Sequence, residues 1–207
     1  MKQFTTSYFR NIPLKKEHCS YIWYEELLDK LYDLFQQVHD YHTSSIFKDK
    51  RTLCGMFNFH FPHGFVIPED NNTKQPDPYQ RTFTAFLTEF NKFCSDLGLL
   101  YFWVREQDTS IHPHYHLFLF ISKEKKRSLH RLFVYASSLW CKHLDIPVMR
   151  GYVQESRNHT INWKKGNNCN NPSYCRAFKH AAYLAKIKEK ALTPSNVNLY
   201  GHSKKGK

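Results

Sequence analysis

The sequence has no segment that could cross a membrane. No uninterrupted apolar run in its 207 residues approaches the roughly 18–20 residues that a bilayer requires. The residues that follow Met1 also lack the apolar core of a signal peptide. We therefore expect no contact with a membrane and a cytoplasmic location.

Two motifs of cysteine and nucleotide chemistry are missing as well. None of the six cysteines belongs to a CxxC pair, so Cys169 and Cys175, which share a polar loop, make a poor zinc site. No Walker A loop is present, which excludes a fused nucleotide-driven helicase. With 41% hydrophobic residues, the chain can nonetheless build a packed core.

Acidic residues are scarce relative to basic ones. Eighteen Asp and Glu stand against thirty Lys and Arg, which gives a formal net charge of +12. The positive side chains gather in four segments, residues 123–131, 164–165, 176–190 and 204–207. Clustered positive charge indicates a partner that carries phosphate, above all a nucleic acid.

Hydrophobic periodicity divides the chain into an N-terminal helical extension, residues 1–50, and a main domain, residues 51–207. The predicted helices cover residues 24–41, 79–97, 125–144 and 176–191, and the predicted strands cover 52–61, 99–105, 114–121 and 148–154. After residue 50 the order is strand, helix, strand, strand, helix, strand.

That order is typical of an α+β, ferredoxin-like split β-α-β fold. Such a fold has an antiparallel sheet with helices on one face, and it leaves the other face free for a ligand. The first helix carries a Leu and Phe stripe that serves either a dimer or duplex contact or the core itself, and we favour the core.

Two histidines separated by one residue begin the third strand. Because side chains alternate faces in a strand, His114 and His116 lie side by side on one face. Glu106 ends the preceding strand, and a hairpin would bring it beside them. Two imidazoles and a carboxylate suit Mn²⁺ or Mg²⁺ in contact with a phosphate. Asp108 and His112 are alternative ligands, and ordinary sheet histidines are the simpler interpretation.

A tyrosine lies between lysines on the last predicted helix. Lys179, Tyr183, Lys186 and Lys190 fall on one helical stripe. A phenol acts as a nucleophile only in its negative form, which nearby ammonium groups and a metal would favour. The alternative is a structural phenol among solvated lysines.

Together these segments resemble the HUH-endonuclease superfamily, whose single-tyrosine Rep proteins initiate rolling-circle replication. His114-Tyr115-His116 is similar to its His-hydrophobic-His motif, Tyr183-Leu184-Ala185-Lys186 to its YxxK motif, and the strand 53–59 to its first motif. With Tyr200-Gly201-His202-Ser203 near the end, the local sequence of these motifs is most similar to the inovirus Gp2 and YagK–YfjJ C-terminal branch. The resemblance covers about residues 50–203.

The resemblance implies an HUH/RRM-like fold and a site-specific nickase for single-stranded DNA, working in a bacterial host cell on a phage, satellite or plasmid. It implies Tyr183 as the nucleophile that forms a 5′-phosphotyrosine, Lys186 as its cationic partner, and His114, His116 and Glu106 as ligands of Mn²⁺ or Mg²⁺. The partners would be origin DNA, in single-stranded or hairpin form, and a host helicase and polymerase. The residues expected to bind DNA are Trp163, Lys164, Lys165, Arg176 and Lys179.

Two other functions fit the same pattern. One is a Y1-type transposase, which would cleave stem-loops at element ends as a stable dimer. The other is a non-catalytic nucleic-acid-binding replication regulator of the same fold, in which the histidines are structural. Formation of a covalent protein–DNA adduct separates the nickase from the regulator.

Overall fold

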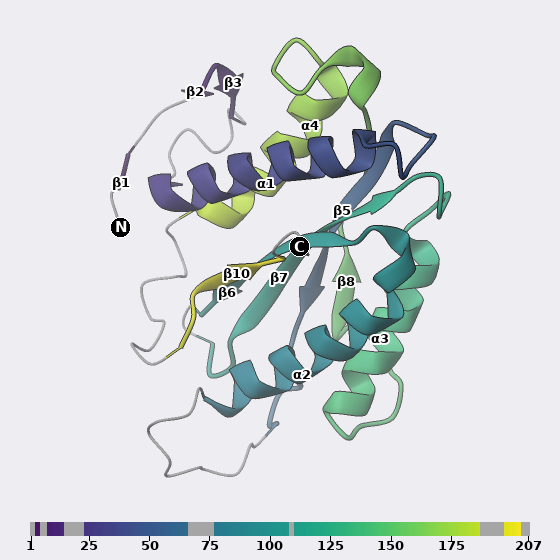
Figure 1. Ribbon diagram of the computed structural model, residues 1–207. Coiled ribbons are helices and arrows are strands. Elements are labelled where there is room, and N and C mark those ends of the chain that lie inside the picture. The colour runs from purple at the N-terminus through teal and green to yellow at the C-terminus, as the bar shows by residue number, and fades with distance from the viewer. Residues whose placement is uncertain are drawn as a thin grey trace.

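The structure, a computed structural model, describes residues 3–4, 8–14, 23–65, 77–107, 110–186 and 197–203. Its centre is a sheet with strand order β10-β6-β7-β5-β8, in which β9 also pairs with β5. Figure 1 shows this sheet between two layers of helices. The strands of the sheet are β5 (Arg51–Phe59), β6 (Leu100–Glu106), β7 (His114–Ser122), β8 (Val153–Glu155), β9 (His159–Asn162) and β10 (Tyr200–His202).

Four helices pack on the sheet: α1 (Glu25–Thr43), α2 (Pro78–Phe93), α3 (His130–His143) and α4 (Pro172–Ala181). Three 3-10 turns follow α2, β9 and α4, at Ser95–Leu97, Trp163–Lys165 and Ala182–Ala185. Two short pairs precede α1: β1 (Gln3–Phe4) with β4 (Trp23–Tyr24), and β2 (Tyr8–Phe9) with β3 (Ile12–Pro13). None of the described helices is both long and apolar enough to span a membrane.

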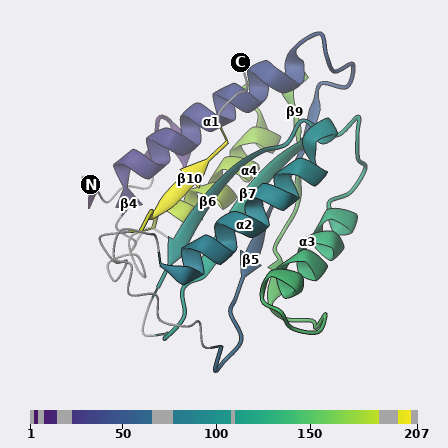
Figure 2. The same ribbon diagram turned by 60° about the horizontal axis from the view of Figure 1, so that its bottom comes forward.

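The predicted α+β class with an antiparallel sheet is confirmed, because every strand pair in the sheet is antiparallel. The central strand β7 lies between β5 and β6, the two strands that α2 connects. At the edge, β10 runs beside β6, and Tyr200 reaches α1 with a 2.7 Å hydrogen bond to Glu26 (Figure 2). Gly201 is required there, since a Cβ would lie 2.6 Å from the Trp103 indole.

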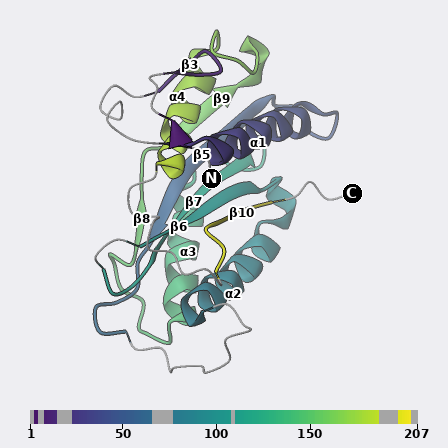
Figure 3. The same ribbon diagram turned by 90° about the vertical axis from the view of Figure 1, so that its left-hand side faces the viewer.

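Helices cover both faces of the sheet, so the expectation of one free face is wrong. The side chains of β7 alternate between two separate hydrophobic cores, one on each face of the sheet. Figure 3 shows α1 and α4 on one side of the sheet and α2 and α3 on the other. Phe118 and Phe120 belong to the core under α1 and α4, whereas Tyr115, Leu117 and Leu119 belong to the core under α2 and α3. Since apolar side chains occupy both faces of the strand, both faces need cover. The stripe of α1 therefore packs on the core.

Several element boundaries differ from the prediction for local reasons. The helix expected from residue 125 begins at His130, because the N–H groups of Lys125 and Lys126 instead bond to Ser122 O in a turn. The strand expected from residue 148 is reduced to β8, since Gly151 adopts a φ of 105°. The strand β9 lies between residues 154 and 176, where no strand or helix was predicted.

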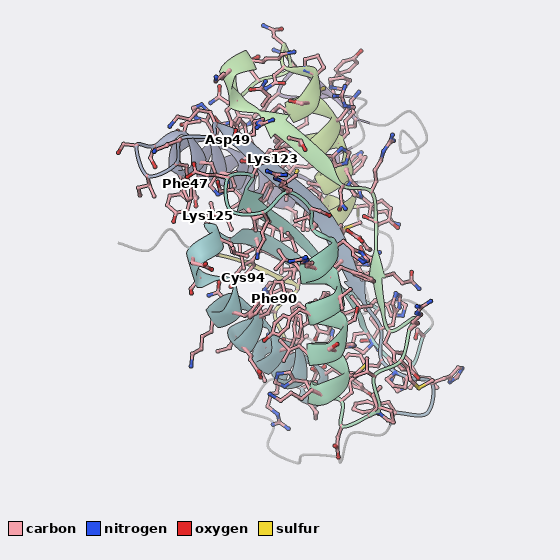
Figure 4. All side chains as sticks on the ribbon, turned by 90° about the vertical axis from the view of Figure 1, so that its right-hand side faces the viewer. Phe47, Asp49, Phe90, Cys94, Lys123 and Lys125 are labelled. Carbon is pink, nitrogen blue, oxygen red and sulfur yellow. The ribbon has the colours of Figure 1, made fainter. Side chains whose placement is uncertain are left out.

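The two connections at the far end of the sheet, after α1 and after β7, lie side by side (Figure 4). There the Glu124 carboxylate accepts hydrogen bonds from the N–H groups of Lys48 and Asp49. Asp49 pairs with Arg51, which lowers the pKa of the carboxyl group. In the same view Phe90 and Cys94 lie between α2 and α3, within the second core.

Candidate active site

The histidine pair lies at the start of β7, on the α1/α4 face of the sheet. The strand register places His114 opposite Glu106 of β6, and His116 between Asn58 of β5 and Val104 of β6. His116 is 8% exposed and Glu106 only 1% exposed. The expected proximity of Glu106 to the two histidines is therefore present.

His116 has an oxygen atom against each of its ring nitrogens. Its Nδ1 lies 2.7 Å from Asn58 Oδ1, and its Nε2 lies 3.0 Å from Glu106 Oε2. In this amide orientation both oxygens are acceptors, and a neutral imidazole has only one N–H to donate. A neutral ring can donate from Nε2 to Glu106 and accept at Nδ1 from the Asn58 amide in its other orientation, so both ring nitrogens have polar partners.

A third histidine, which the sequence analysis did not identify, lies beside the pair. The rings of His60 and His114 are 4.5 Å apart, and His60 Nε2 is buried with no hydrogen-bond partner in the described part of the chain. Burial, and then the proximity of His114 and His116, lowers the pKa of His60 to about 4. The ring is therefore neutral at pH 7. Strand alternation was the missed signal, since His60 continues the face of Asn58 one residue past β5.

These residues do not form a closed metal-binding cluster. Within the described ranges, no three His, Cys, Asp or Glu side chains converge as metal ligands would. The alternative ligand His112 is hydrogen-bonded to the Tyr79 hydroxyl at 3.0 Å and lines a hollow of about 390 Å³ beside His60 and His114. Asp108 lies outside the described residues.

Tyr183 and Lys186 meet directly, but not as one helical stripe. The helix α4 ends at Ala181, the 3-10 turn Ala182–Ala185 carries Tyr183, and Lys186 is extended. The expectation of a helix to residue 191 is wrong because Lys186 leaves it to form a β-bridge with Trp23. Lys190 lies outside the described residues.

A short hydrogen bond joins Lys186 to the Tyr183 phenol. Lys186 is 3% exposed, and its Nζ donates a 2.6 Å hydrogen bond to Tyr183 Oη. An ammonium group in this position stabilises negative charge on the phenol oxygen. The Tyr183 ring lies edge-on to His116, with 6.3 Å between centroids. Tyr183, Lys186, His116 and Glu106 thus form one site.

The residues expected to bind DNA divide into surface and core positions. Lys164, Lys165 and Arg176 are exposed, and Lys179 is half-buried. Trp163 is only 4% exposed and donates a 2.7 Å hydrogen bond from Nε1 to Thr52 Oγ1. It packs in the core beside α1, so this indole is not exposed for a contact with DNA, contrary to the expectation. Trp163 begins the 3-10 turn that follows β9, and the pairing of β9 with β5 carries it into the core.

The model of the YagK/YfjJ C-terminal domain family matches residues 30–203. This chain belongs to that family. The match runs from within α1 to the end of β10, so the YagK/YfjJ domain includes every site residue named above. The resemblance to the YagK–YfjJ branch that the sequence showed is confirmed.

No curated protein sequence matches this YagK/YfjJ domain. Among solved structures, the catalytic domain of the adeno-associated virus type 5 Rep protein is similar, at 16% sequence identity and a TM-score of 0.36. That match covers 54% of this chain and 75% of the viral domain. Because so low a TM-score does not establish a common fold, we base function on the side chains described above.

Proposed function

We propose that this YagK/YfjJ domain is a metal-dependent endonuclease that nicks single-stranded DNA through a covalent tyrosine intermediate. The observation that carries the proposal is the 2.6 Å hydrogen bond from the buried Lys186 ammonium to Tyr183 Oη, next to the His116–Glu106 pair. A phenol held by a cation beside acidic and imidazole ligands has the parts that phosphoryl transfer to tyrosine requires.

The polar residues on the same face of the sheet fit a divalent cation. His116 Nε2 and Glu106 Oε2 are 3.0 Å apart, and two atoms bound at right angles to one ion at about 2.1 Å each are separated by about 3 Å. Asn58 would orient His116 from outside, as outer ligands of metal sites do. His114 is the third expected ligand, and the unpartnered Nε2 of His60 adds a fourth candidate.

Bound Mn²⁺ or Mg²⁺ would supply positive charge against the oxygens of the scissile phosphate. The Tyr183 phenolate attacks the phosphorus, the bond to the 3′ oxygen breaks, and that oxygen takes up a proton. The products are a 5′-phosphotyrosine and a free 3′-OH. Lys186 holds the phenol oxygen and balances its charge before the attack. Because the phosphodiester energy is kept, the strand can be rejoined without ATP.

The biological role that we propose is initiation of rolling-circle replication of a phage, satellite or plasmid. The partners would then be single-stranded or hairpin origin DNA, and a host helicase and polymerase that use the free 3′-OH. Since α1 and α4 cover this face of the sheet, the DNA strand would not cross an open sheet face. The DNA would reach Tyr183 from the edge of the layer that α1 and α4 form.

The test is incubation of the protein with a pool of single-stranded origin-region oligonucleotides and Mn²⁺. A denaturing gel and peptide mass spectrometry should show a DNA adduct on the Tyr183 peptide. EDTA should abolish the adduct. Folded, Mn²⁺-loaded protein that forms no adduct with cognate DNA would contradict the proposal.

One observation favours a second candidate, a non-catalytic DNA-binding regulator. No three-ligand metal cluster is assembled among the described residues, and both ring nitrogens of His116 already lie within hydrogen-bond distance of protein side chains. This candidate predicts tight DNA binding that neither forms an adduct nor responds to Mn²⁺. The same gel and a binding titration with and without metal distinguish the two.

A further inference from the structure

A second hollow lies between the β8–β9 connection and α4. Its volume is about 280 Å³. Figure 3 shows α4 beside β9, and Ser173 of α4 accepts a 3.1 Å hydrogen bond from the N–H of Asn162 in β9. The hollow is lined by Ser156, Arg157, His159, Arg176, Lys179 and His180.

The lining carries three cations and no acidic side chain. Arg157, Arg176 and Lys179 form no ion pair within the described ranges. The neighbouring carboxylate, Glu155, is not part of the lining and accepts a 2.6 Å hydrogen bond from Asn158. Three cations that lack acidic partners leave the positive charge available to an anion.

The floor of the hollow is held by a chain of hydrogen bonds. His180 Nε2 lies 3.0 Å from Ser156 Oγ, and His180 Nδ1 lies 3.1 Å from His159 Nε2. The His180 ring also packs edge-on against Phe118 of β7, with 5.5 Å between centroids. The polar floor therefore packs against the central strand of the sheet.

Burial, and then the proximity of Arg157 and Arg176, lowers the pKa of His159 to about 4. His159 is therefore neutral at pH 7, and Arg157, Arg176 and Lys179 supply positive charge around it. Arginine presents a planar pair of N–H donors that matches two phosphate oxygens. A hydroxyl and a neutral imidazole below two arginines suit a phosphate better than a carboxylate-rich or apolar ligand.

We propose that this hollow binds a backbone phosphate of the DNA strand that is cleaved at Tyr183, and so sets which phosphate reaches the nucleophile. The inference rests on the proposed function. Lys179 and His180 lie near the end of α4, and Tyr183 follows three to four residues later in the 3-10 turn after that helix. We expect a DNA strand held at Arg157 and Arg176 to run from the hollow towards the phenol.

The experiment measures binding of a fluorescein-labelled single-stranded oligonucleotide, selected from a randomised pool, by fluorescence anisotropy. All proteins carry Tyr183→Phe, so that no strand is cut. The test variant adds Arg157→Gln and Arg176→Gln. The matched control adds Lys92→Gln and Arg131→Gln, two exposed cations on α2 and α3 in the other helical layer.

We expect the affinity of the test variant to fall at least about tenfold, since each charge-assisted hydrogen bond to a phosphate is worth roughly a factor of ten or more. The slope of log K against log salt should fall by about 0.7 for each phosphate of a single strand that the variant no longer neutralises. The control should change neither quantity. An equal fall in both variants, or an unchanged salt slope, would overturn the proposal.

A scan with single methylphosphonate linkages locates the phosphate. One neutral linkage near the cleavage position should weaken binding to the parent protein but not to the test variant, which no longer has the arginines that hold this phosphate. Direct titration with inorganic phosphate and with a mononucleotide tests for a free ligand. Tight binding of either, with no methylphosphonate effect, would assign the hollow to a small phosphate compound and refute the DNA contact.

The outcome is independent of the chemistry at Tyr183. If the adduct assay fails but the methylphosphonate effect is present, the endonuclease function is wrong and the phosphate contact stands. If the adduct forms and the effect is absent, the hollow is not a DNA contact. Should the double variant unfold, which thermal denaturation detects, the Arg157→Gln single variant on the exposed connection replaces it.

Discussion

On the α2/α3 face of the sheet, the central strand contributes four fully buried side chains: Tyr115, Leu117, Leu119 and Ile121. On the α1/α4 face, the same strand contributes two phenylalanines and then, at its start, His114 and His116. The first face is an aromatic core, in which Phe83 stacks on Tyr115 at 4.1 Å between centroids. The second ends in a cluster of buried polar groups.

The difference between the two faces is a difference in energetic cost. Aromatic packing on the α2/α3 face stabilises the fold through apolar burial. On the other face Glu106, His116 and Lys186 are buried, and burying such groups costs free energy unless each is paired. Buried polar groups that lower the stability of a core and lie close to one another indicate a functional site. Variants on each face test whether the α1/α4 face carries the activity and the α2/α3 face the stability.

The largest expected effect is that of Tyr183→Phe on the α1/α4 face. Without the phenol oxygen no covalent intermediate forms, so nicking should fall by at least about 10³-fold. Stability should fall modestly although the ring is kept, because the buried Lys186 ammonium loses the oxygen that accepts its 2.6 Å hydrogen bond. Adduct formation on a denaturing gel gives the measurement. Tyr200→Phe is the matched control, because that hydroxyl bonds to Glu26 and not to the site; equal loss in both would refute the assignment.

On the α2/α3 face the expected effect is on stability. Phe83→Ala removes a fully buried ring that packs on Phe59, Trp103 and Tyr115, and it should lower the free energy of unfolding by about 3–5 kcal/mol. Urea denaturation measures the change. Phe83→Leu, which keeps most of the volume, should cost less and retain full adduct formation below its melting temperature. A folded Phe83→Leu protein that cannot nick would show that the two faces are coupled.

A structural histidine gives the third effect. His42 of α1 is fully buried, with hydrogen bonds to Thr52 and to Gly98 O, and burial lowers its pKa to about 4 from 6.5. In the unfolded chain the His42 ring is protonated below about pH 6.5, whereas in the folded protein it is protonated only below about pH 4. The stability that the neutral ring contributes is therefore present above pH 6.5 and is lost as the pH falls towards 4.

At pH 5 this loss from His42 should be about 2 kcal/mol relative to pH 7. Urea denaturation at both pH values measures it. His42→Gln should remove that part of the pH dependence, and His39→Gln, on the same helix but more exposed, should not. An unchanged difference between pH 7 and pH 5 in the His42→Gln variant would contradict the prediction.

The smallest expected effect concerns His60, the histidine that the sequence analysis did not identify. If His60 contributes its unpartnered Nε2 to the metal, His60→Ala should weaken Mn²⁺ binding by about tenfold, while His114→Ala with His116→Ala abolishes it. Isothermal titration calorimetry measures both. His63→Ala, which changes a histidine in the same hollow, is the control. Unaltered Mn²⁺ affinity in the His60 variant would leave His60 a structural residue.

Much of the site could be predicted because its signals are local. The period-two alternation of β7 and the spacing of Tyr183 and Lys186 lie within short stretches of chain. The errors have equally physical causes. Nothing near Ala181 stops a helix, so the turn at Tyr183 depends on the bridge from Lys186 to Trp23. Trp163 lay outside every predicted helix and strand. The strand before it, β9, could not be predicted because it is stabilised by pairing with β5, more than a hundred residues away in sequence.

The sequence by itself determined that His114 and His116 share a face, that Glu106 ends the neighbouring strand and that the chain is strongly basic. Only the tertiary structure decided that Asn58 and Glu106 both contact His116, that His60 lies against His114, and that Arg157 joins Arg176 around one hollow. Alternation along a strand is a local property of the backbone. Strand register and helix docking join residues far apart in sequence, and they depend on the packing of the whole core.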